Sequence, residues 1–497
     1  MYNTSVVAIS VLFGWLVPMT STVFVYNFVF FINIFLIGCV GRAILRECGI
    51  RPWLSTWGGI MFCIMPYLTA QELGHMSQYV VSPLFVATYL FVRCINGKAN
   101  HQMIYGTAIG VVCAAEFYTS LELTVTFLLV LSIFLIYLGI QKSGRTWIQI
   151  HFGPLPGRFW IPLVLSAVIL MLPGIFAFIL TGGLLFSGVE MHPNSGEYWV
   201  ADFLSPWYPT RLSLIHTALT QRITNDDFLG TPEEHGNYVG IFFFCSALIL
   251  CRAWRTPVSR SLSWLAITMF ILSLGTHVHV FGRQLPIVLP WILFSHVPFL
   301  NSALPIRLAL YVDAGLVIWT TMSLQHYLSS AGSVSIRRFI WLTFICFLPL
   351  VSWLPTVDYP YSSVYSLPKA IVQQIGSQPV FWITPNFGYD MQALTASRYE
   401  IKVYNMYGFS PSDALNQAAG ASLSQFQFSA QYGSSALWVQ QITTIKQTLH
   451  SGYVLLTPFD PSGVPLPSNL KQELTNSFGK PVLQIKGCDL WAIRNKE

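Results

Sequence analysis

Charged side chains are scarce in this sequence of 497 residues. Asp, Glu, Lys and Arg make up 9% of it and hydrophobic residues 54%, with a mean hydropathy of +0.56. Soluble globular domains carry about 25% charged residues. No soluble fold covers so much apolar surface with so few charges, so the composition predicts a membrane protein whose chain crosses the bilayer several times.

Several familiar motifs are also missing. None of the nine cysteines belongs to a CxxC pair or a Cys/His ligand pattern, which argues against a disulfide framework and a zinc site. There is no P-loop, no dinucleotide fingerprint and no nucleophile elbow. The chain does not begin with a cleavable signal pattern, so we expect no removable signal peptide. We expect no nucleic-acid partner.

What the sequence does have is a series of long apolar runs. A helix needs about 20 apolar residues to cross a bilayer. On that measure we predict about ten spans, and a shorter run at 6–17 either crosses or lies in the interface. The ten spans lie near residues 22–44, 52–68, 80–96, 101–118, 120–140, 159–181, 237–252, 261–275, 305–329 and 338–356.

Basic residues alternate between the loops that join these spans. Loops rich in Lys and Arg, such as the one around Arg42 and Arg46, are followed by loops with few or none. This is the positive-inside pattern. It places loops 69–79, 182–236 and 276–304 outside, together with the C-terminal tail. The 276–304 loop is apolar and rich in proline, so we expect a re-entrant or interfacial segment there.

The composition changes at about residue 358, where Ser and Gln become common. The predicted fold class is therefore a polytopic α-helical membrane protein with about 10–11 transmembrane helices, followed by a small extracytoplasmic α/β domain. Residues 1–357 would form the first part and 358–497 the second. The expected strands are 379–384, 401–404, 453–457, 482–485 and 490–493, and the expected helices are 436–450 and 468–478.

A short polar turn at residues 66–78 separates two predicted spans and has no Lys or Arg. It contains Glu72 and His75, which would share one face of a helix end. Ionisable groups near lipid are costly and are candidates for function, and a carboxylate beside an imidazole can exchange protons, bind a metal or hold a phosphate. The alternative is a polar turn that caps two helices. Glu116 and Glu122 flank the next external turn, and they too are either functional groups or parts of a solvated turn.

The 182–236 loop carries a second set of acidic candidates. Asp202, Glu233 and Glu234 lie in it, among several aromatic residues that argue against disorder. Paired acids can bind a divalent cation through their oxygens. Adjacent Glu residues are also common at the start of a solvated helix, because acids favour a helix N-terminus.

Two arginines, Arg283 and Arg307, lie on the predicted outer face. Arg307 stands at the opening of a span, where a guanidinium can grip a phosphate or diphosphate bidentately. The alternative is an arginine that snorkels to the head groups, and Asp313 could simply pair with Arg307 or with a neighbour. His277 and His279 lack a third ligand by spacing, so we do not expect a metal site there.

The order of these short motifs resembles that of GT-C membrane glycosyltransferases, among them protein mannosyltransferase-like and arabinofuranosyltransferase-like proteins. The resemblance covers most of the chain. The motifs that carry it are Asn3-Thr-Ser5, Met65-Pro66-Tyr67, Gln71-Glu-Leu-Gly74-His75, Pro83-Leu84, Asp202-Phe-Leu-Ser-Pro206, Glu234-His-Gly-Asn-Tyr238-Val-Gly240, Ser273-Leu-Gly275, Leu304-Pro-Ile-Arg307 and Val380-Phe-Trp-Ile-Thr-Pro385.

This resemblance implies an inverting transfer of a sugar from a polyprenyl-phosphate donor to an envelope glycan, lipid or protein acceptor at the outer face. It implies acceptor or metal contacts at Glu72, His75 and Asp202, and donor-phosphate contacts at Arg307 and Arg283. A divalent cation is a possible cofactor, with Glu233 and Glu234 as weak candidate ligands.

One feature of such enzymes is not found in this sequence. Their catalytic acid normally lies in a first external loop that follows an initial span. Here Met1 stands directly in the region that would follow that loop, and no acidic residue precedes Glu47. We therefore expect either a truncated chain or a member that has lost this acid, which leaves catalytic activity open.

Two other classes of function stay open. A non-catalytic component that helps to assemble envelope polymers is consistent with all of these sequence features, except that it would not need the acidic residues. A transporter would show inverted repeats and broken helices, and the sequence shows no repeated motif. In each case we expect a multi-pass protein of the plasma (cytoplasmic) membrane, in contact with lipids, with its C-terminal domain outside.

Overall fold

The computed structural model describes residues 7–73, 75–97, 101–153, 155, 157–180, 195–230, 234–240, 256–297, 300, 303–330, 336–356, 367–383, 452–457 and 470–493. The chain separates into two compact units. The membrane unit is Thr4–Met19 with Val25–Tyr359, and the C-terminal unit is Pro360–Glu497 with Met1–Asn3 and Thr20–Phe24.

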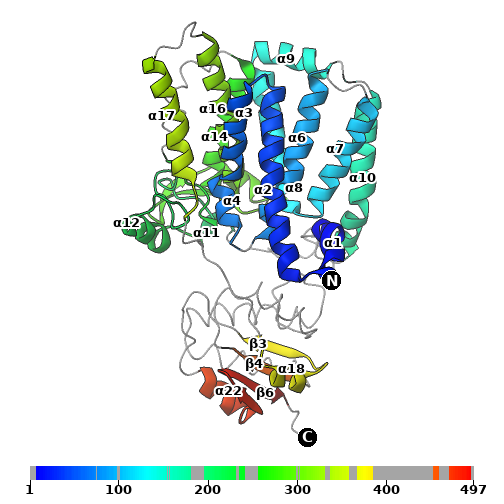
Figure 1. The fold of residues 1–497 in the computed structure, drawn as a ribbon, viewed down its shortest axis with the longest axis vertical. Helices are drawn as coiled ribbons and strands as arrows, with labels where there is room; N and C mark the ends of the chain where they lie inside the picture. Colours follow the sequence, from blue (N-terminus) through cyan, green and yellow to red (C-terminus); the bar gives the residue numbers. More distant parts are fainter. Residues whose placement is uncertain are drawn as a thin grey trace. The chain divides into compact units, whose positions relative to one another are not determined.

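The membrane unit is built from long helices, several of which stand side by side in Figure 1. The predicted fold class is confirmed, because the described chain is mostly helical and has a small mixed sheet near its C-terminus. The longer helices are α2 (Thr22–Glu47), α3 (Pro52–Cys63), α6 (Ser82–Ile95), α7 (Gln102–Phe117), α8 (Leu121–Ile140), α9 (Lys142–Phe152), α10 (Gly157–Leu180), α14 (Pro257–Ser273), α16 (Ala309–Ser330) and α17 (Ile336–Trp353).

Within the described residues, five segments are long and apolar enough to cross a membrane, so the protein is a multi-pass membrane protein. The five are Val23–Glu47, Met76–Ile95, Leu121–Ile140, Gly157–Phe176 and Pro305–Ser329. The run at 6–17 forms a short helix, α1 (Val7–Phe13), followed by a 3-10 segment, η1 (Gly14–Met19). Most of the predicted span 237–252 lies outside the described residues.

The predicted span 52–68 differs from the structure in an instructive way. It is divided into α3 and a short helix α4 (Pro66–Gln71), with Ile64 and Met65 between them. Pro66 lacks a backbone N–H and therefore begins a new helix rather than continuing the old one. The polar stretch that follows the break contains a second short helix, α5 (Met76–Tyr79).

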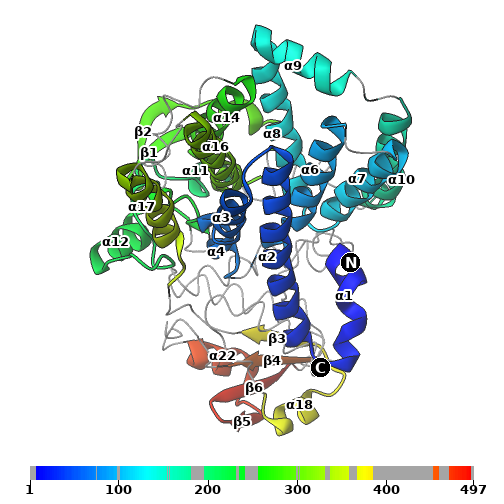
Figure 2. The same ribbon diagram turned by 45° about the horizontal axis from the view of Figure 1, so that its top comes forward.

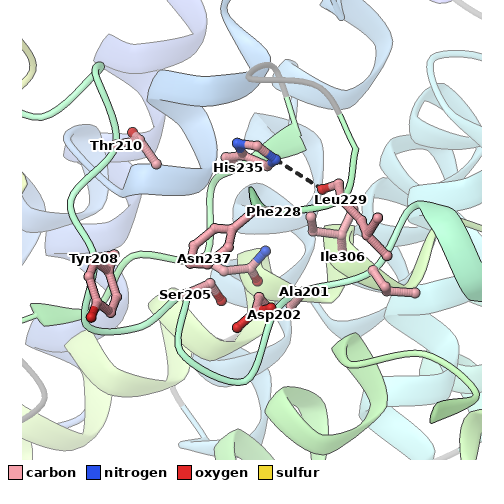
Figure 3. Close-up of a pocket in the computed structure, with 11 residues that line it drawn as sticks. Ala201, Asp202, Ser205, Tyr208, Thr210, Phe228, Leu229, His235, Asn237 and Ile306 are labelled. Carbon is pink, nitrogen blue, oxygen red and sulfur yellow. Dashed lines mark hydrogen bonds between the residues drawn. The ribbon is translucent and has the colours of Figure 1, made fainter. Parts of the chain in front are cut away.

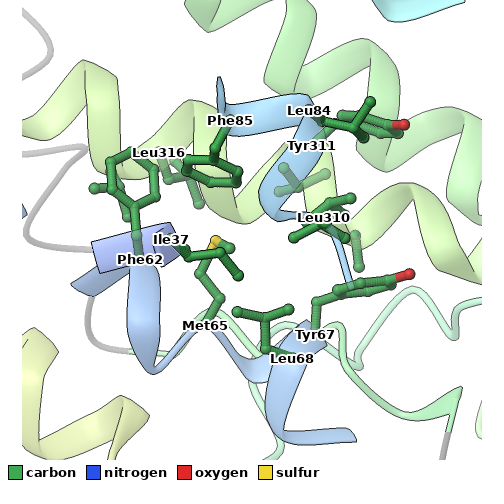
Figure 4. Close-up of a cluster of buried hydrophobic side chains, with 14 of the residues drawn as sticks. Ile37, Phe62, Met65, Tyr67, Leu68, Leu84, Phe85, Leu310, Tyr311 and Leu316 are labelled. Atoms are coloured by element: carbon green, nitrogen blue, oxygen red, sulfur yellow. The ribbon is translucent and has the colours of Figure 1, made fainter. Parts of the chain in front are cut away.

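The core of the membrane unit lies where α2, α3, α4, α6 and α16 meet. Figure 4 shows apolar side chains from these helices pointing toward one another. Among them, Ile37, Phe62 and Met65 have no exposed surface.

Helices α7 and α10 approach each other closely through two glycines. A Cβ atom at Gly106 would clash with the carbonyl oxygen of Phe159, and one at Gly110 would clash with Ser166. The spacing of four residues puts both glycines on one face of α7, as in other close helix pairs in membranes.

The 276–304 segment, expected to be re-entrant or interfacial, contains a β-hairpin that the sequence pattern did not predict. Strands β1 (His277–Val280) and β2 (Arg283–Val288) pair antiparallel. The tip is Phe281 and Gly282, with φ angles of 49° and 69°. Positive φ at both central residues is typical of a tight two-residue hairpin turn. A short helix, α15 (Trp291–Phe294), follows.

The C-terminal unit holds a four-stranded mixed sheet in the order β3-β4-β6-β5 (Figure 2). Strand β3 (Val380–Ile383) runs parallel to β4 (Gly452–Leu456), and β6 (Cys488–Ile493) runs antiparallel to both β4 and β5 (Leu483–Ile485). Helix α18 (Lys369–Ile375) adds Ile371 and Ile375 to its apolar core, and α22 (Leu470–Phe478) is the other described helix of this unit. The predicted strand 401–404 and helix 436–450 lie outside the described residues.

Candidate functional site

Arg307 is the centre of a polar cluster at the end of the membrane helices. It lies in a short 3-10 segment, η5 (Pro305–Leu308), just before α16. Its Nε atom donates to both carboxylate oxygens of Glu234, at 3.1 Å each, and its Nη2 atom also bonds this carboxylate. Its Nη1 atom pairs with Glu122. One guanidinium therefore links two carboxylates from distant parts of the chain.

Amide and imidazole groups from the polar turn complete this cluster. Gln71 donates to Glu234 at 3.0 Å, and Gln78 donates to Glu122 at 2.9 Å. His75 places its Nδ1 atom 3.6 Å from a Glu234 oxygen. We call these six residues the Arg307 cluster: Gln71, His75, Gln78, Glu122, Glu234 and Arg307.

The backbone positions the members of the Arg307 cluster. Ser120 caps the start of α8 by accepting from the N–H of Leu123, and this cap holds Glu122 in the first turn. The N–H of Leu304 donates to Glu122 at 2.9 Å. Gly236 packs against the backbone of Tyr67 so closely that a Cβ atom would not fit. The 234–237 segment is thus pressed against the start of α4.

Burial makes this cluster electrostatically strong. The side chain of Glu234 is 1% exposed, that of Arg307 13% and that of Glu122 16%. Burial alone would raise the pKa of Glu234, but the charge of Arg307 and the neighbouring His75 and Gln71 hold it below its usual value. Glu234 is therefore an ionised carboxylate near neutral pH. With one arginine and two carboxylates, the cluster carries a net charge of −1 when both carboxylates are ionised and His75 is neutral.

His75 is the most accessible ionisable group of the cluster, with a side chain that is 36% exposed. It precedes α5 as its N-cap residue. Glu72 lies at the C-cap of α4 and is half-buried, with its N–H bonded to the carbonyl oxygen of Leu68. These two residues were predicted from sequence as catalytic candidates, and the structure joins His75 to Arg307 through Glu234.

Asp202 has a different environment from the Arg307 cluster. It is 3% exposed, and its carboxylate accepts from the N–H groups of Leu204 and Gly282, each at 2.9 Å. The second bond ties the tip of the β1–β2 hairpin to the long loop. Burial raises the pKa of Asp202, although these backbone donors oppose the rise. In this arrangement Asp202 anchors the hairpin, and its predicted catalytic role stays a prediction.

A small cavity adjoins Asp202, with Ser205, His235, Asn237 and Ile306 in its lining (Figure 3). Its volume of about 10 Å³ is at the lower limit for holding one water molecule. His235 is turned to the carbonyl oxygen of Leu229, at 3.0 Å. This cavity is too small for a sugar.

The other predicted site residues are distributed as follows. Arg283 lies exposed at the start of β2. Glu233 lies outside the described residues, so the suggested Glu233–Glu234 cation site stays a prediction. Within the described part of the chain, no group of three or more His, Cys, Asp or Glu side chains is arranged to hold a metal ion.

Two buried carboxyl groups do not contact Arg307. Asp313 accepts from the N–H of Tyr67 at 3.2 Å, so it caps α4 from α16 instead of pairing with Arg307. Glu116 is fully buried in α7, and neither of its oxygens has a hydrogen-bond partner among the described residues. The alternative pairing of Asp313 with a neighbour is therefore the one observed.

Sequence reasoning identified some members of this cluster and missed the roles of others. It proposed His75 and Arg307 for chemistry, left Glu122 between a functional group and a turn residue, and considered Glu234 as a cation ligand or as part of a helix start. Gln71 and Gln78 were not selected. The available signal was the pair of amides seven residues apart in a turn without basic residues, which fits carboxylate partners supplied by other segments.

The fold is similar to that of a membrane glycosyltransferase. A cryo-EM structure of the arabinofuranosyltransferase AftD from Mycobacteria aligns with 99% of this chain at a TM-score of 0.55 and 12% sequence identity. The alignment covers 35% of AftD, so this chain spans about a third of that protein. At this identity the likeness concerns the fold alone.

The chain belongs to the DUF6311 family, which is defined by a domain of unknown function. The family's sequence model matches residues 5–303. This range includes most of the Arg307 cluster, although Arg307 itself follows it. No curated protein matches this chain.

Proposed function

We propose that this protein is a membrane glycosyltransferase of the GT-C type. It would transfer a sugar from a polyprenyl-phosphate donor to an envelope glycan, lipid or protein acceptor at the outer face of the plasma membrane. The observation that carries the proposal is the buried Arg307 cluster at the ends of the membrane helices, in a chain whose fold is similar to that of an arabinofuranosyltransferase.

In this proposal Arg307 holds the donor phosphate. The guanidinium of Arg307 is already hydrogen-bonded to the carboxylates of Glu234 and Glu122, so a phosphate must displace one of them. Glu122, which is 16% exposed, is the more accessible of the two, whereas Glu234 is 1% exposed and bonded through two guanidinium nitrogens. The phosphate would therefore replace Glu122, while Glu234 keeps Arg307 oriented.

His75 would serve as the base in this reaction. The acceptor hydroxyl gives its proton to the imidazole and its oxygen forms a bond to the sugar's anomeric carbon. The bond from that carbon to the phosphate oxygen breaks at the same time, and polyprenyl phosphate leaves with the electron pair, which inverts the anomeric centre. Glu234 stabilises the imidazolium that forms, because its ionised carboxylate lies 3.6 Å from His75 Nδ1.

A non-catalytic role in envelope polymer assembly is the second candidate function. Arg307 is already saturated by two carboxylates, which is also what a purely structural ion cluster would show. The two functions make opposite predictions for His75. A transferase needs its imidazole as the base, whereas a structural cluster does not need a partly exposed histidine.

The test is a transfer assay with the full chain reconstituted in liposomes. Polyprenyl-phosphate-linked arabinose and mannose serve as donors, and alkyl oligosaccharides as acceptors. We expect transfer by the wild type and a loss of about 100-fold or more in His75→Ala, as for other positioned bases. His296→Ala is the matched control, because His296 is an exposed histidine whose ring bonds Ile292 and Ser295 of its own turn among the described residues. Equal transfer by wild type and His75→Ala would exclude His75 as the base, and no transfer from either donor by folded wild type would favour the structural role.

A further inference from the structure

Helix α9 joins two membrane spans, and this fixes its place relative to the bilayer. It begins two residues after Ile140, the end of the Leu121–Ile140 span, and ends five residues before the Gly157–Phe176 span begins. Both spans therefore meet the same membrane surface at α9. In Figures 1 and 2, α9 lies crosswise to α8 at its end. Its 11 residues give it a length of about 16 Å along that surface.

The crosswise position of α9 is fixed by specific contacts. Gly144 lies directly on the carbonyl oxygen of Leu138, where a Cβ atom would not fit. The side chain of Gln141 donates to the carbonyl oxygen of Tyr137 and to the hydroxyl of Ser261 in α14, each at 2.9 Å. The turn between α8 and α9 is thus held by two helices, and α9 cannot swing freely into solution.

One side of α9 packs on the membrane unit through aromatic residues. Phe152 contacts the rings of Phe91 in α6 and Trp160 in α10, at centroid distances of 5.4 and 6.4 Å. Trp147 stacks on His151 one turn later. The opposite side is left facing outward and carries Lys142, Arg145 and Ile150, all of them exposed.

The exposed side combines cations with aliphatic groups and lacks acidic residues. Arg158 is also exposed at the start of α10, and no Asp or Glu occurs between Glu122 and Glu190. Ile140 and Ile150 are 71% and 62% exposed. Cations beside exposed aliphatic side chains at the level of a bilayer surface are typical of interfacial helices that bind anionic lipids.

We propose that α9 is an interfacial helix that binds anionic phospholipid head groups through Lys142, Arg145 and Arg158. Ile140 and Ile150 enter the boundary of the acyl chains beside these cations. The charge complementarity selects an anionic lipid over a zwitterionic one. This inference is independent of the proposed transferase activity, because it rests only on the spans that flank α9 and on its exposed side.

The test measures lipid binding by the full chain in detergent. Phosphatidylglycerol or phosphatidylcholine is added, and bound lipid is counted by native mass spectrometry while thermal unfolding is followed in parallel. We expect phosphatidylglycerol to bind preferentially and to raise the unfolding temperature. In the Lys142→Gln/Arg145→Gln/Arg158→Gln variant, its affinity should fall about fivefold for each charge removed.

The matched control removes three exposed cations elsewhere, with Arg222→Gln/Lys480→Gln/Lys486→Gln, and should keep the preference. A preference that is unchanged in the α9 variant would overturn the proposal, and so would equal binding of both lipids by the wild type. Glycerol phosphate that competes as well as the lipid would show a free-phosphate site instead. Displacement of the lipid by an acidic protein would show a protein-docking surface. Either of these last two outcomes would contradict the proposal that α9 binds anionic lipid.

Discussion

Arg307 carries one positive charge between two carboxylates, and the exposure of its partners differs. Glu234 is almost completely buried and Glu122 is partly accessible. Removing one partner of a buried ion pair leaves an uncompensated charge, which is usually more damaging than losing the attraction itself. We therefore expect Glu234 to stabilise the fold, and Glu122 to be the carboxylate that a ligand can replace.

The stability of the fold should depend strongly on Glu234. Glu234→Gln keeps the side-chain volume but removes the charge that faces Arg307 and His75, so we expect a loss of about 3 kcal/mol in the free energy of unfolding. Thermal unfolding of the purified protein in detergent measures it. Glu197→Gln changes an exposed carboxylate and should have little effect. Equal unfolding temperatures for the two variants would contradict the role given to Glu234.

The same residue should set an acid limit on stability. The folded pKa of Glu234 is lowered, so its ionised form contributes stability at pH values above about 4.3, the ordinary value for Glu. This contribution is lost as the pH falls through the lowered pKa. Unfolding temperature measured against pH should therefore decline on the acid side less steeply in Glu234→Gln than in wild type. If the unfolding temperatures of wild type and Glu234→Gln decline equally steeply with falling pH, other carboxylates govern this decline.

Asp202 should control the tip of the β1–β2 hairpin rather than the ion cluster. Asp202→Ala removes the acceptor for the N–H groups of Leu204 and Gly282. Hydrogen bonds to a charged group contribute about 1.5–3 kcal/mol, so amide hydrogen exchange at Gly282 should become about tenfold faster or more. Asp202→Asn should have a smaller effect, because one acceptor oxygen remains. If Asp202→Ala abolishes sugar transfer while exchange at Gly282 is unchanged, the catalytic prediction for Asp202 regains support.

At the scale of elements, the close contact between α7 and α10 depends on glycine. Gly110→Ala places a methyl group against Ser166 and the carbonyl oxygen of Leu163, and overpacking of this kind costs about 1–3 kcal/mol. Gly139→Ala in α8 is the matched control, because nothing lies within 4 Å of its Cβ position. We expect Gly110→Ala to lower the unfolding temperature and Gly139→Ala to leave it equal or slightly higher. The reverse order would contradict the observed packing.

The helices were more predictable from the sequence than the hairpin. Apolar runs such as the one that forms α8 are long and uninterrupted, so bilayer length alone predicted them. The division of 52–68 was missed because the span was predicted from apolar length, which carried it past Pro66, the residue at which α4 begins. The β1–β2 hairpin was missed because Pro286 obscured β2 and the tip residues, Phe281 and Gly282, are not a common hairpin pair.

For the complete chain, the class of protein was predictable from the sequence, whereas the contacts within the site were not. Charge scarcity predicted the membrane fold, and a resemblance suggested the transferase. The partners of Arg307 could not be predicted, because Glu122 and Glu234 lie 185 and 73 residues away from it in the chain. Only the folded arrangement of the helix ends brings these side chains together.

In the proposed mechanism, the Arg307 cluster binds the donor phosphate, which takes the place of Glu122 on the guanidinium. The most direct measurement is the affinity of the purified protein for polyprenyl phosphate, compared between wild type and Glu122→Gln. Gln keeps the shape of the side chain but cannot carry the charge that competes with the phosphate, so we expect tighter binding, by about tenfold for 1.4 kcal/mol of relieved competition. Arg222→Gln, which changes an exposed cation outside the cluster, should match the wild type. If binding weakens or stays the same in Glu122→Gln, the phosphate does not replace Glu122, and Arg307 is not the donor-phosphate site.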